Sequence, residues 1–256
     1  MSKNRYEVLE HGQGEPLVML HGMMGSPENW RPLFAYLPAG CHGIALRFPF
    51  FQEGISLPDV EAVGNYLMEF LDARGLSRVG ICGNSLGGHV GVDLAARVPQ
   101  RIRGLVLTGS GGLFERSFAR VSSHPPRDWV RQRIREIFFD PRHVTEELVD
   151  NVIRIIAVRR NARDLLSIAK SAKRDNITDR LPHVQCPVLI VWGRQDTVTP
   201  PDVAEELLRG LRLREIVWLD QCGHAPMIEY PRLFGEALGR WWGVHMNGHP
   251  AEGPTP

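Results

Sequence analysis

Short runs of apolar residues, each bounded by glycine or proline, recur along the 256-residue chain. Such runs, four to seven residues long here, are typical of strands that are buried on both faces, as in a parallel sheet. We expect strands over Pro16–Leu20, Gly43–Leu46, Arg78–Cys82, Ile102–Thr108, Pro187–Trp192 and Glu215–Leu219.

The segments between these runs carry apolar residues at helical spacing. The positions that share a helix face are Val60, Val63, Leu67, Phe70 and Leu71; Val90, Leu94 and Val98; Val203, Leu207 and Leu208; and Phe234, Leu238, Trp241 and Trp242. Strands that alternate with helices in this way predict a doubly wound, mostly parallel α/β sheet.

The alternation is interrupted between residues 113 and 183, where helices are expected over Val130–Phe139, Glu146–Val158 and Leu165–Ala172. An independent helical domain is one interpretation of this stretch. The return to a strand at Pro187 favours an insertion into a single sheet domain. We therefore expect residues 1–112 and 184–243 to form one core and residues 113–183 to form a helical cap, or lid, over it. The Gly/Pro-rich residues 244–256 are expected to be a disordered tail.

Charge and composition exclude several kinds of partner. The formal net charge is +1, which favours neither a nucleic-acid partner nor a polybasic membrane anchor. The opening residues MSKNRYEVLEHG contain no apolar signal segment, and no apolar run approaches the length of a membrane span. We expect a cytoplasmic protein whose thiols are reduced, because its cysteines are widely spaced and form no C-x-x-C pair: Cys41, Cys82, Cys186 and Cys222.

One short motif points to chemistry. In GICGNSLGGHV, residues 80–90, Ser85 lies between Gly83 and Gly87, directly after a predicted strand and before a predicted helix. At such a strand-to-helix turn a serine is held in a strained conformation with its hydroxyl exposed above the sheet. Glycines on either side let strand and helix approach closely. Ser85 is therefore a candidate nucleophile, although a Gly-rich turn without a catalytic partner would give the same pattern.

A serine hydroxyl needs a base to accept its proton, and that base needs a carboxylate to orient it. His224 follows the predicted strand Glu215–Leu219, and Asp196 follows the strand Pro187–Trp192. Ligands of open α/β sheets bind at this carboxyl edge. A helix-capping histidine and an aspartate in a turn are the structural alternatives. The chain order Ser85, Asp196, His224 favours a catalytic triad.

A tetrahedral oxyanion needs two N–H donors, commonly from the backbone. We expect one from Leu86, the residue after the nucleophile, and one from Met23, in the loop after Pro16–Leu20. In the same loop His21 is expected to brace the backbone rather than to act as a base. The histidines form no H-x-H or H-E-x-x-H pattern, so we expect no metal site and no cofactor.

These residues resemble the α/β-hydrolase superfamily. The resemblance rests on LVMLHGMMGSPENW, GICGNSLGGHVGVDLA, CPVLIVWGRQDTVTPP and CGHAPMIEYP, which together span nearly the whole chain. It implies the α/β-hydrolase fold, with a helical cap inserted after the sixth core strand, and a Ser–His–Asp hydrolase. Because this fold hosts many reactions, the resemblance does not define the substrate.

Within the superfamily, Asn84 and the stretch HVTEELVDNVIRIIAVRR are similar to the carbon–carbon bond hydrolases of aromatic meta-cleavage pathways. Those enzymes usually carry Trp directly after the catalytic His, where this chain has Ala225. They also carry a cap Arg that polarises the dienoate. The aligned position here is Val152, and Arg154 is close enough to substitute for it.

The sequence thus predicts a serine hydrolase that cleaves a small-molecule carboxylic ester through an acyl-enzyme intermediate. Hydrolysis of 2-hydroxy-6-oxo-dienoates is the alternative reaction. A non-catalytic receptor that only binds a small molecule is the alternative from another class. Beyond the triad and the oxyanion donors, the candidate pocket residues are His21, Met24, Asn84, Ala225 and Arg154.

Overall fold

The computed structural model describes residues 5–114 and 125–246. In these residues a seven-stranded sheet has the order β1-β3-β2-β4-β5-β6-β7. Only β1 runs antiparallel to its neighbour, β3, and the other strand pairs are parallel. The strands are β1 (Val8–Gly12), β2 (Glu15–Leu20), β3 (Cys41–Leu46), β4 (Val79–Asn84), β5 (Ile102–Thr108), β6 (Val188–Gly193) and β7 (Arg214–Leu219).

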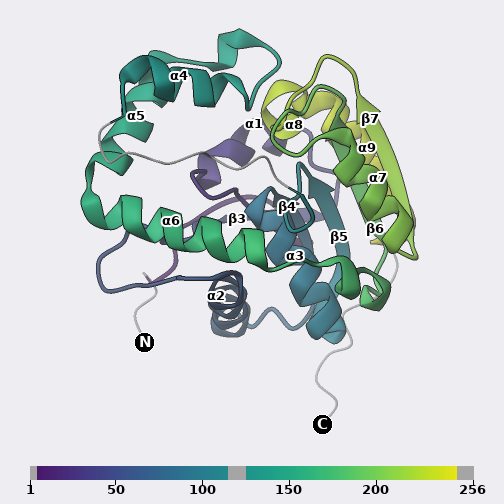
Figure 1. Ribbon diagram of the computed structural model, residues 1–256. Coiled ribbons are helices and arrows are strands. Elements are labelled where there is room, and N and C mark those ends of the chain that lie inside the picture. The colour runs from purple at the N-terminus through teal and green to yellow at the C-terminus, as the bar shows by residue number, and fades with distance from the viewer. Residues whose placement is uncertain (1–4, 115–124, 247–256) are drawn as a thin grey trace.

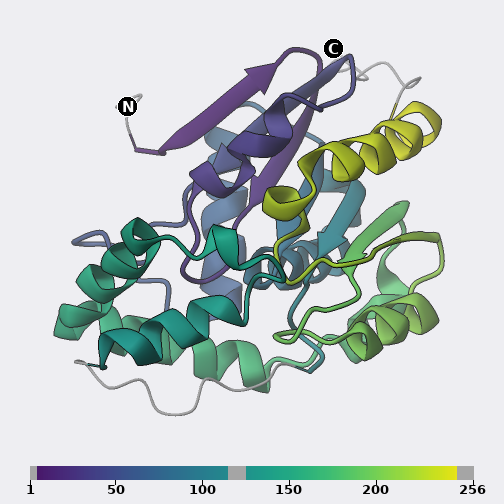
Figure 2. The same cartoon turned by 90° about the horizontal axis from the view of Figure 1, so that it is seen from above.

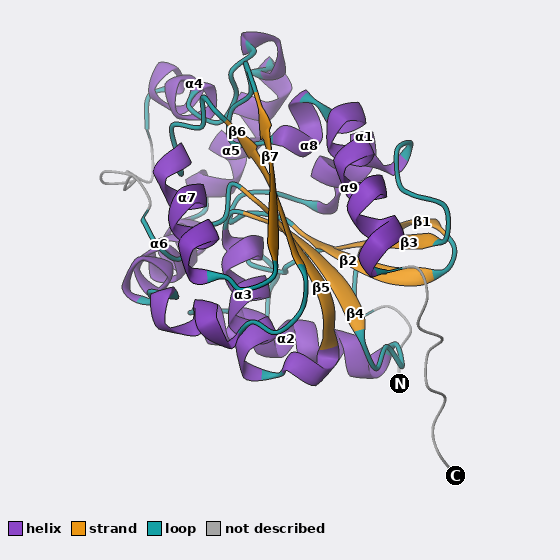
Figure 3. Cartoon of the chain, turned by 90° about the vertical axis from the view of Figure 1, so that its right-hand side faces the viewer, coloured by secondary structure: helices purple, strands orange, loops and turns teal. Residues whose placement is uncertain are grey.

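Helices cover both faces of this sheet (Figure 3). The α-helices are α1 (Arg31–Phe34), α2 (Val60–Ala73), α3 (Leu86–Arg97), α4 (Arg127–Arg135), α5 (Glu146–Ala157), α6 (Arg159–Arg174), α7 (Pro201–Gly210), α8 (Pro226–Glu229) and α9 (Pro231–His245). Short 3₁₀ helices are η1 (Pro27–Trp30), η2 (Pro99–Arg101), η3 (Pro141–His143) and η4 (Thr178–His183). Side-chain caps define some starts: Asp59 Oδ1 accepts the N–H of Ala62 at α2, and Thr145 Oγ1 accepts that of Leu148 at α5.

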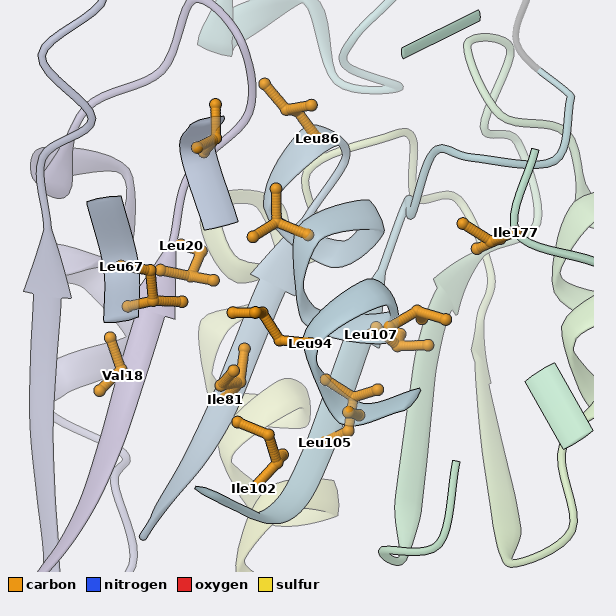
Figure 4. Packing of buried hydrophobic residues seen from close by; sticks show 14 of the residues in the cluster. Val18, Leu20, Leu67, Ile81, Leu86, Leu94, Ile102, Leu105, Leu107 and Ile177 are labelled. Atoms are coloured by element: carbon orange, nitrogen blue, oxygen red, sulfur yellow. The ribbon is translucent and has the colours of Figure 1, made fainter. Parts of the chain in front are cut away.

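The core consists of two layers, one on each face of the sheet. Successive residues of β2 alternate between them: Val18 belongs to the layer formed with α2, α3 and α7, and Met19 to the layer formed with α1, α8 and α9. Figure 4 shows part of the first layer, where β4 and β5 pack against α3. Both layers lie below the carboxyl ends of the strands, so the loops that follow these ends are carried on a rigid base.

The six predicted strands are confirmed, and each of their ends lies within two residues of the predicted one. β1 is the strand that the pattern did not predict. Its residues are at best half-buried, and Glu10 and His11 are exposed, so β1 gives no apolar run. The predicted tail is wrong at its start, because α9 continues through His245. Residues 247–256 of that tail lie outside the described residues.

Within the described residues, the α-helices α4, α5 and α6 are inserted between β5 and β6. They form the group at the upper left and front of Figure 1, and the teal-to-green group of Figure 2. The insertion was expected after the sixth strand, but it follows the fifth, because five strands, β1 to β5, precede it in the described residues. The inserted helices have an apolar cluster of their own, built on Val130, Ile134, Val149, Ile156 and Leu165. We call it the insert cluster.

None of the helices in the described residues combines the length and the apolar character that crossing a membrane requires. No group of three or more His, Cys, Asp or Glu side chains in these ranges is arranged to hold a metal ion.

Candidate active site

Ser85 occupies the turn between β4 and α3 in a strained conformation. Its φ and ψ are 54° and −117°, a region that non-glycine residues rarely adopt. Such strain costs about 1–3 kcal/mol and persists only where the surroundings enforce it. Here the Ser85 N–H donates to Thr108 O at 3.2 Å, and the Ser85 carbonyl accepts from His89 N and Gly111 N at 3.1 and 3.0 Å. The turn is therefore held by bonds from both sides.

Close backbone approaches explain the glycines around Ser85. A Cβ on Gly83 would lie 2.4 Å from Gly87 O, and one on Gly87 would lie 2.2 Å from Leu20 O. One on Gly88 would lie 2.6 Å from the hydroxyl of Ser110. The first two contacts involve backbone atoms, which cannot rotate away, so the strand and the helix can meet at this angle only with glycine there.

Asp196 and His224 are brought together from the loops after β6 and β7. The Nδ1–H of His224 donates to Asp196 Oδ2 at 2.9 Å, and both side chains are almost fully buried. The other carboxylate oxygen, Oδ1, accepts the N–H groups of Val198 and Thr199 at 2.8 and 2.9 Å. Because an ionised carboxylate only accepts, the Nδ1 proton is fixed and Nε2 is left as the basic nitrogen.

Thr199 is a neighbour of this pair that the sequence did not reveal as functional. Its hydroxyl donates to Asp196 Oδ2 at 2.8 Å and lies 3.1 Å from His224 Nδ1. The side chain is fully buried, and Trp192 Nε1 donates to its carbonyl at 3.1 Å. A threonine three residues after an aspartate is a turn signal, and that signal could have indicated the contact.

Asn84 ties the serine turn to the histidine loop. Its Nδ2 donates to Thr108 O at 3.1 Å and to His224 O at 3.0 Å, which uses both amide hydrogens. The side chain is 6% exposed. The sequence places Asn84 in the substrate pocket. The structure corrects this expectation for the amide N–H groups, because both of them donate to backbone carbonyls of the site and neither is left for a substrate.

The loop after β2 lies against Ser85. A Cβ on Gly22 would be 3.2 Å from Ser85 Cβ and 3.6 Å from its hydroxyl oxygen. Met23 follows in this loop, and Leu86 is the first residue of α3, whose N–H has no partner within the helix. Both predicted oxyanion donors thus belong to backbone segments next to the Ser85 side chain, and the positive end of the α3 dipole also favours an anion there.

His21 braces this loop with both ring nitrogens. Phe48 N–H donates to Nε2 at 3.0 Å, so the ring proton is on Nδ1, which donates to Gly22 O at 2.7 Å. Burial lowers the pKa of His21 from 6.5 to about 4. A ring whose nitrogens are both hydrogen-bonded cannot act as a base or contact a substrate through them. His21 therefore supports the loop, and its expected place among the pocket residues is corrected.

We expect the free energy of unfolding to fall by about 2 kcal/mol between pH 7 and pH 5 because of His21 alone. The unfolded chain binds a proton at this ring below pH 6.5, whereas the folded chain resists it until about pH 4. Urea unfolding at the two pH values measures the loss. His21→Asn, which cannot titrate, should lack that part of the slope, and the exposed His183→Asn should keep it. An equal slope in wild type and His21→Asn would contradict the assignment.

The remaining pocket candidates lie in different places. Arg154 is on the exposed face of α5, with Nη1 3.4 Å from Asn151 Oδ1, and the prediction that it faces the pocket is wrong. Val152 lies two residues before Arg154, which corresponds to a rotation of about 200° around the helix axis. Val152 therefore faces inward and packs on the insert cluster. Met24 also packs on that cluster, and Ala225 is buried in the core layer of α8 and α9.

Comparison with known proteins gives the family. Residues 17–237 match the model of the alpha/beta hydrolase family. The chain belongs to this family, and it is an α/β-fold hydrolase.

Two curated relatives and one solved structure are similar over most of their length. The chain is 28% identical over 239 residues to a 2-hydroxy-6-oxo-6-phenylhexa-2,4-dienoate hydrolase of Comamonas testosteroni, covering 84% of this chain and 83% of the relative. It is 30% identical to a 2-hydroxy-6-oxononadienedioate/2-hydroxy-6-oxononatrienedioate hydrolase of Paraburkholderia xenovorans, covering 89% and 86%. An α/β hydrolase enzyme from the metagenome of lagoon sediments at Mar Chica, Morocco, is 33% identical, with a TM-score of 0.77 and coverage of 95% and 97%.

Proposed function

We propose that this hydrolase cleaves a bond to a carbonyl carbon through an acyl-enzyme on Ser85. The observation that carries the proposal is the buried Asp196–His224 pair, which is tied through Asn84 to the strained turn of Ser85. In this reaction His224 Nε2 accepts the Ser85 proton, and the N–H groups of Leu86 and Met23 stabilise the oxyanion. The leaving group takes the proton from His224, and water then releases the acid.

We also propose that α4, α5 and α6 form a cap over this site. Met23 and Met24, in the loop beside Ser85, pack against the insert cluster, and Phe51 and Phe138 contact it as well. The insert cluster therefore contacts the loop that lies beside the nucleophile, and a cap in this place would present apolar side chains to a substrate. A substrate with an apolar acyl or aryl group suits such walls.

A 2-hydroxy-6-oxo-dienoate is the first candidate substrate, and it replaces the ester that the sequence ranked first. The support is the curated relatives, whose names specify hydrolases of such compounds and which match this chain over 84% and 89% of its length. A carbon leaving group departs only if its electron pair is delocalised. The 2-oxo tautomer of a dienoate provides this, because the pair can reach the 2-oxo oxygen.

A carboxylic ester is the second candidate, and two residues favour it. Val152 faces inward at the position where the resemblance implies an arginine, and Arg154 points away. Ala225 stands where those enzymes carry Trp. Burying the carboxylate of a dienoate without a cationic partner is costly, whereas a neutral ester has no such requirement.

The kcat/KM values for a dienoate and for an ester distinguish the two candidate substrates. We expect kcat/KM for 2-hydroxy-6-oxo-6-phenylhexa-2,4-dienoate to exceed that for p-nitrophenyl butyrate by at least about tenfold, a difference of about 1.4 kcal/mol in activation free energy. The opposite ratio would rank the ester first. Absence of both activities, with no fluorophosphonate adduct on Ser85, would contradict the proposed hydrolase and favour a receptor.

A further inference from the structure

One carboxylate beside the site has no part in the reaction proposed above. Glu229 is the last residue of α8, and its Oε1 accepts the N–H of Gly223 at 2.7 Å. Its Oε2 accepts the N–H groups of Phe139 and Asp140 at 2.8 and 2.9 Å. The carboxylate therefore joins the histidine loop to the segment that follows α4, although the two are far apart in the chain.

The two segments are in direct backbone contact at this point. His224 N–H donates to Ile137 O at 2.7 Å. A Cβ on Gly223 would lie 2.6 Å from Ile137 O and 2.8 Å from Phe139 N, so no side chain fits between them. The His224 backbone is thus held by residues 137–139 in addition to its connection to β7.

The loop that carries Asp196 contacts the same segment. Thr197 Oγ1 donates to Glu136 O at 3.0 Å. Residues 136 and 137 are consequently bonded to Thr197, the neighbour of Asp196, and to His224 itself. A displacement of this segment would change the distance between these two side chains.

We propose that Glu229 is a positioning residue, which holds residues 137–140 against Gly223 and so keeps His224 in register with Asp196 and Ser85. The proposal rests on the proposed function, since it assigns Glu229 to the transfer of the Ser85 proton. A carboxylate suits the task because it only accepts, and three N–H donors face it. Hydrogen bonds to an ionised acceptor are also about twice as strong as neutral ones.

Glu229→Gln tests this with little change of shape. The amide can accept on one side only, and its NH₂ group meets an N–H donor on the other. We expect the rate of fluorophosphonate labelling of Ser85 and kcat to fall on the order of 10²-fold, as loss of precise alignment does. KM should stay within about twofold, because substrate contacts are not removed. The matched control is Glu236→Gln on α9, whose side chain is solvent-accessible and pairs with Arg232.

A second measurement separates positioning from general stability. The low-field proton resonance of His224 Nδ1–H, bonded to Asp196, should broaden or disappear in Glu229→Gln and persist in Glu236→Gln. Wild-type labelling rate and resonance in folded Glu229→Gln would overturn the proposal. If glutamine prevents folding, Glu229→Asp, which keeps the charge but not the reach, carries the same expectation. Loss of folding in both would assign Glu229 to stability alone. A wild-type chain that is not labelled at Ser85 would instead contradict the proposed function.

Discussion

Replacing Ser85 by alanine is expected to lower turnover of the substrate that the wild-type chain accepts by at least about 10³-fold. The substitution removes only the hydroxyl oxygen. The strained turn should survive, because the bonds that hold it are made by the backbone of residue 85 and not by its side chain. The Ser85→Ala variant keeps substrate binding and the oxyanion donors, but it has no nucleophile that can form an acyl-enzyme.

The measurement is kcat/KM for wild type and Ser85→Ala on the same substrate, with mass spectrometry of the fluorophosphonate adduct. Ser167→Ala is the matched control, since Ser167 is an exposed serine of α6 whose hydroxyl donates to Pro58 O. It should keep the wild-type rate. A Ser85→Ala variant that retains more than a tenth of that rate would refute the assignment of Ser85 as nucleophile.

Asp196→Asn is expected to lower kcat by about 10⁴-fold through a change of tautomer. The N–H groups of Val198 and Thr199 point at Oδ1, so the asparagine oxygen must stay on that side. Its NH₂ group then faces His224 Nδ1 and donates to it. The ring proton moves to Nε2, and His224 can no longer accept the proton of Ser85.

Asp202→Asn provides the control, because Asp202 is an exposed residue in the first turn of α7. Its activity should match wild type, with at most a small loss of stability from the weaker helix-dipole interaction. The tautomer itself can be read from ¹⁵N shifts of the imidazole. An Asp196→Asn variant with a protonated Nδ1 and wild-type kcat would show that Asp196 does not orient His224.

The sequence predicted the parts of the fold and the site that depend on strand ends. Strand ends are visible in the sequence because a buried parallel strand is an apolar run with a sharp limit. Once Ser85, Asp196 and His224 each follow such a run, parallel pairing places them at one edge of the sheet. The approach of His224 to Asp196 therefore follows from local patterns, whereas the catalytic role of all three is the proposal under test.

Contacts between distant segments could not be read in the same way. Glu229 has no local signal, because its N–H partners at Phe139 and Asp140 are backbone groups that every residue type except proline provides. The direction of Arg154 depended on the helical phase of α5, and an error of two residues moves a side chain to the opposite face. The half-exposed β1 lacked the apolar run on which strand prediction depends.

The hydrogen bonds around Glu229 connect the start of the insertion to the loops of the sheet domain, although the secondary structure separates the two. Residues 136–140 follow α4 in the sequence, but they are bonded to the loops after β6 and β7. A recombination that exchanges the whole stretch 113–183 with that of another family member would also exchange the segment that is bonded to His224 and Thr197. A junction placed at Pro141 would keep this segment but would separate α4 from α5 and α6, whose side chains share the insert cluster. For protein engineering, the insertion is therefore not a unit that can be exchanged freely, because it contributes bonds to the loops of the candidate site as well as its own apolar cluster.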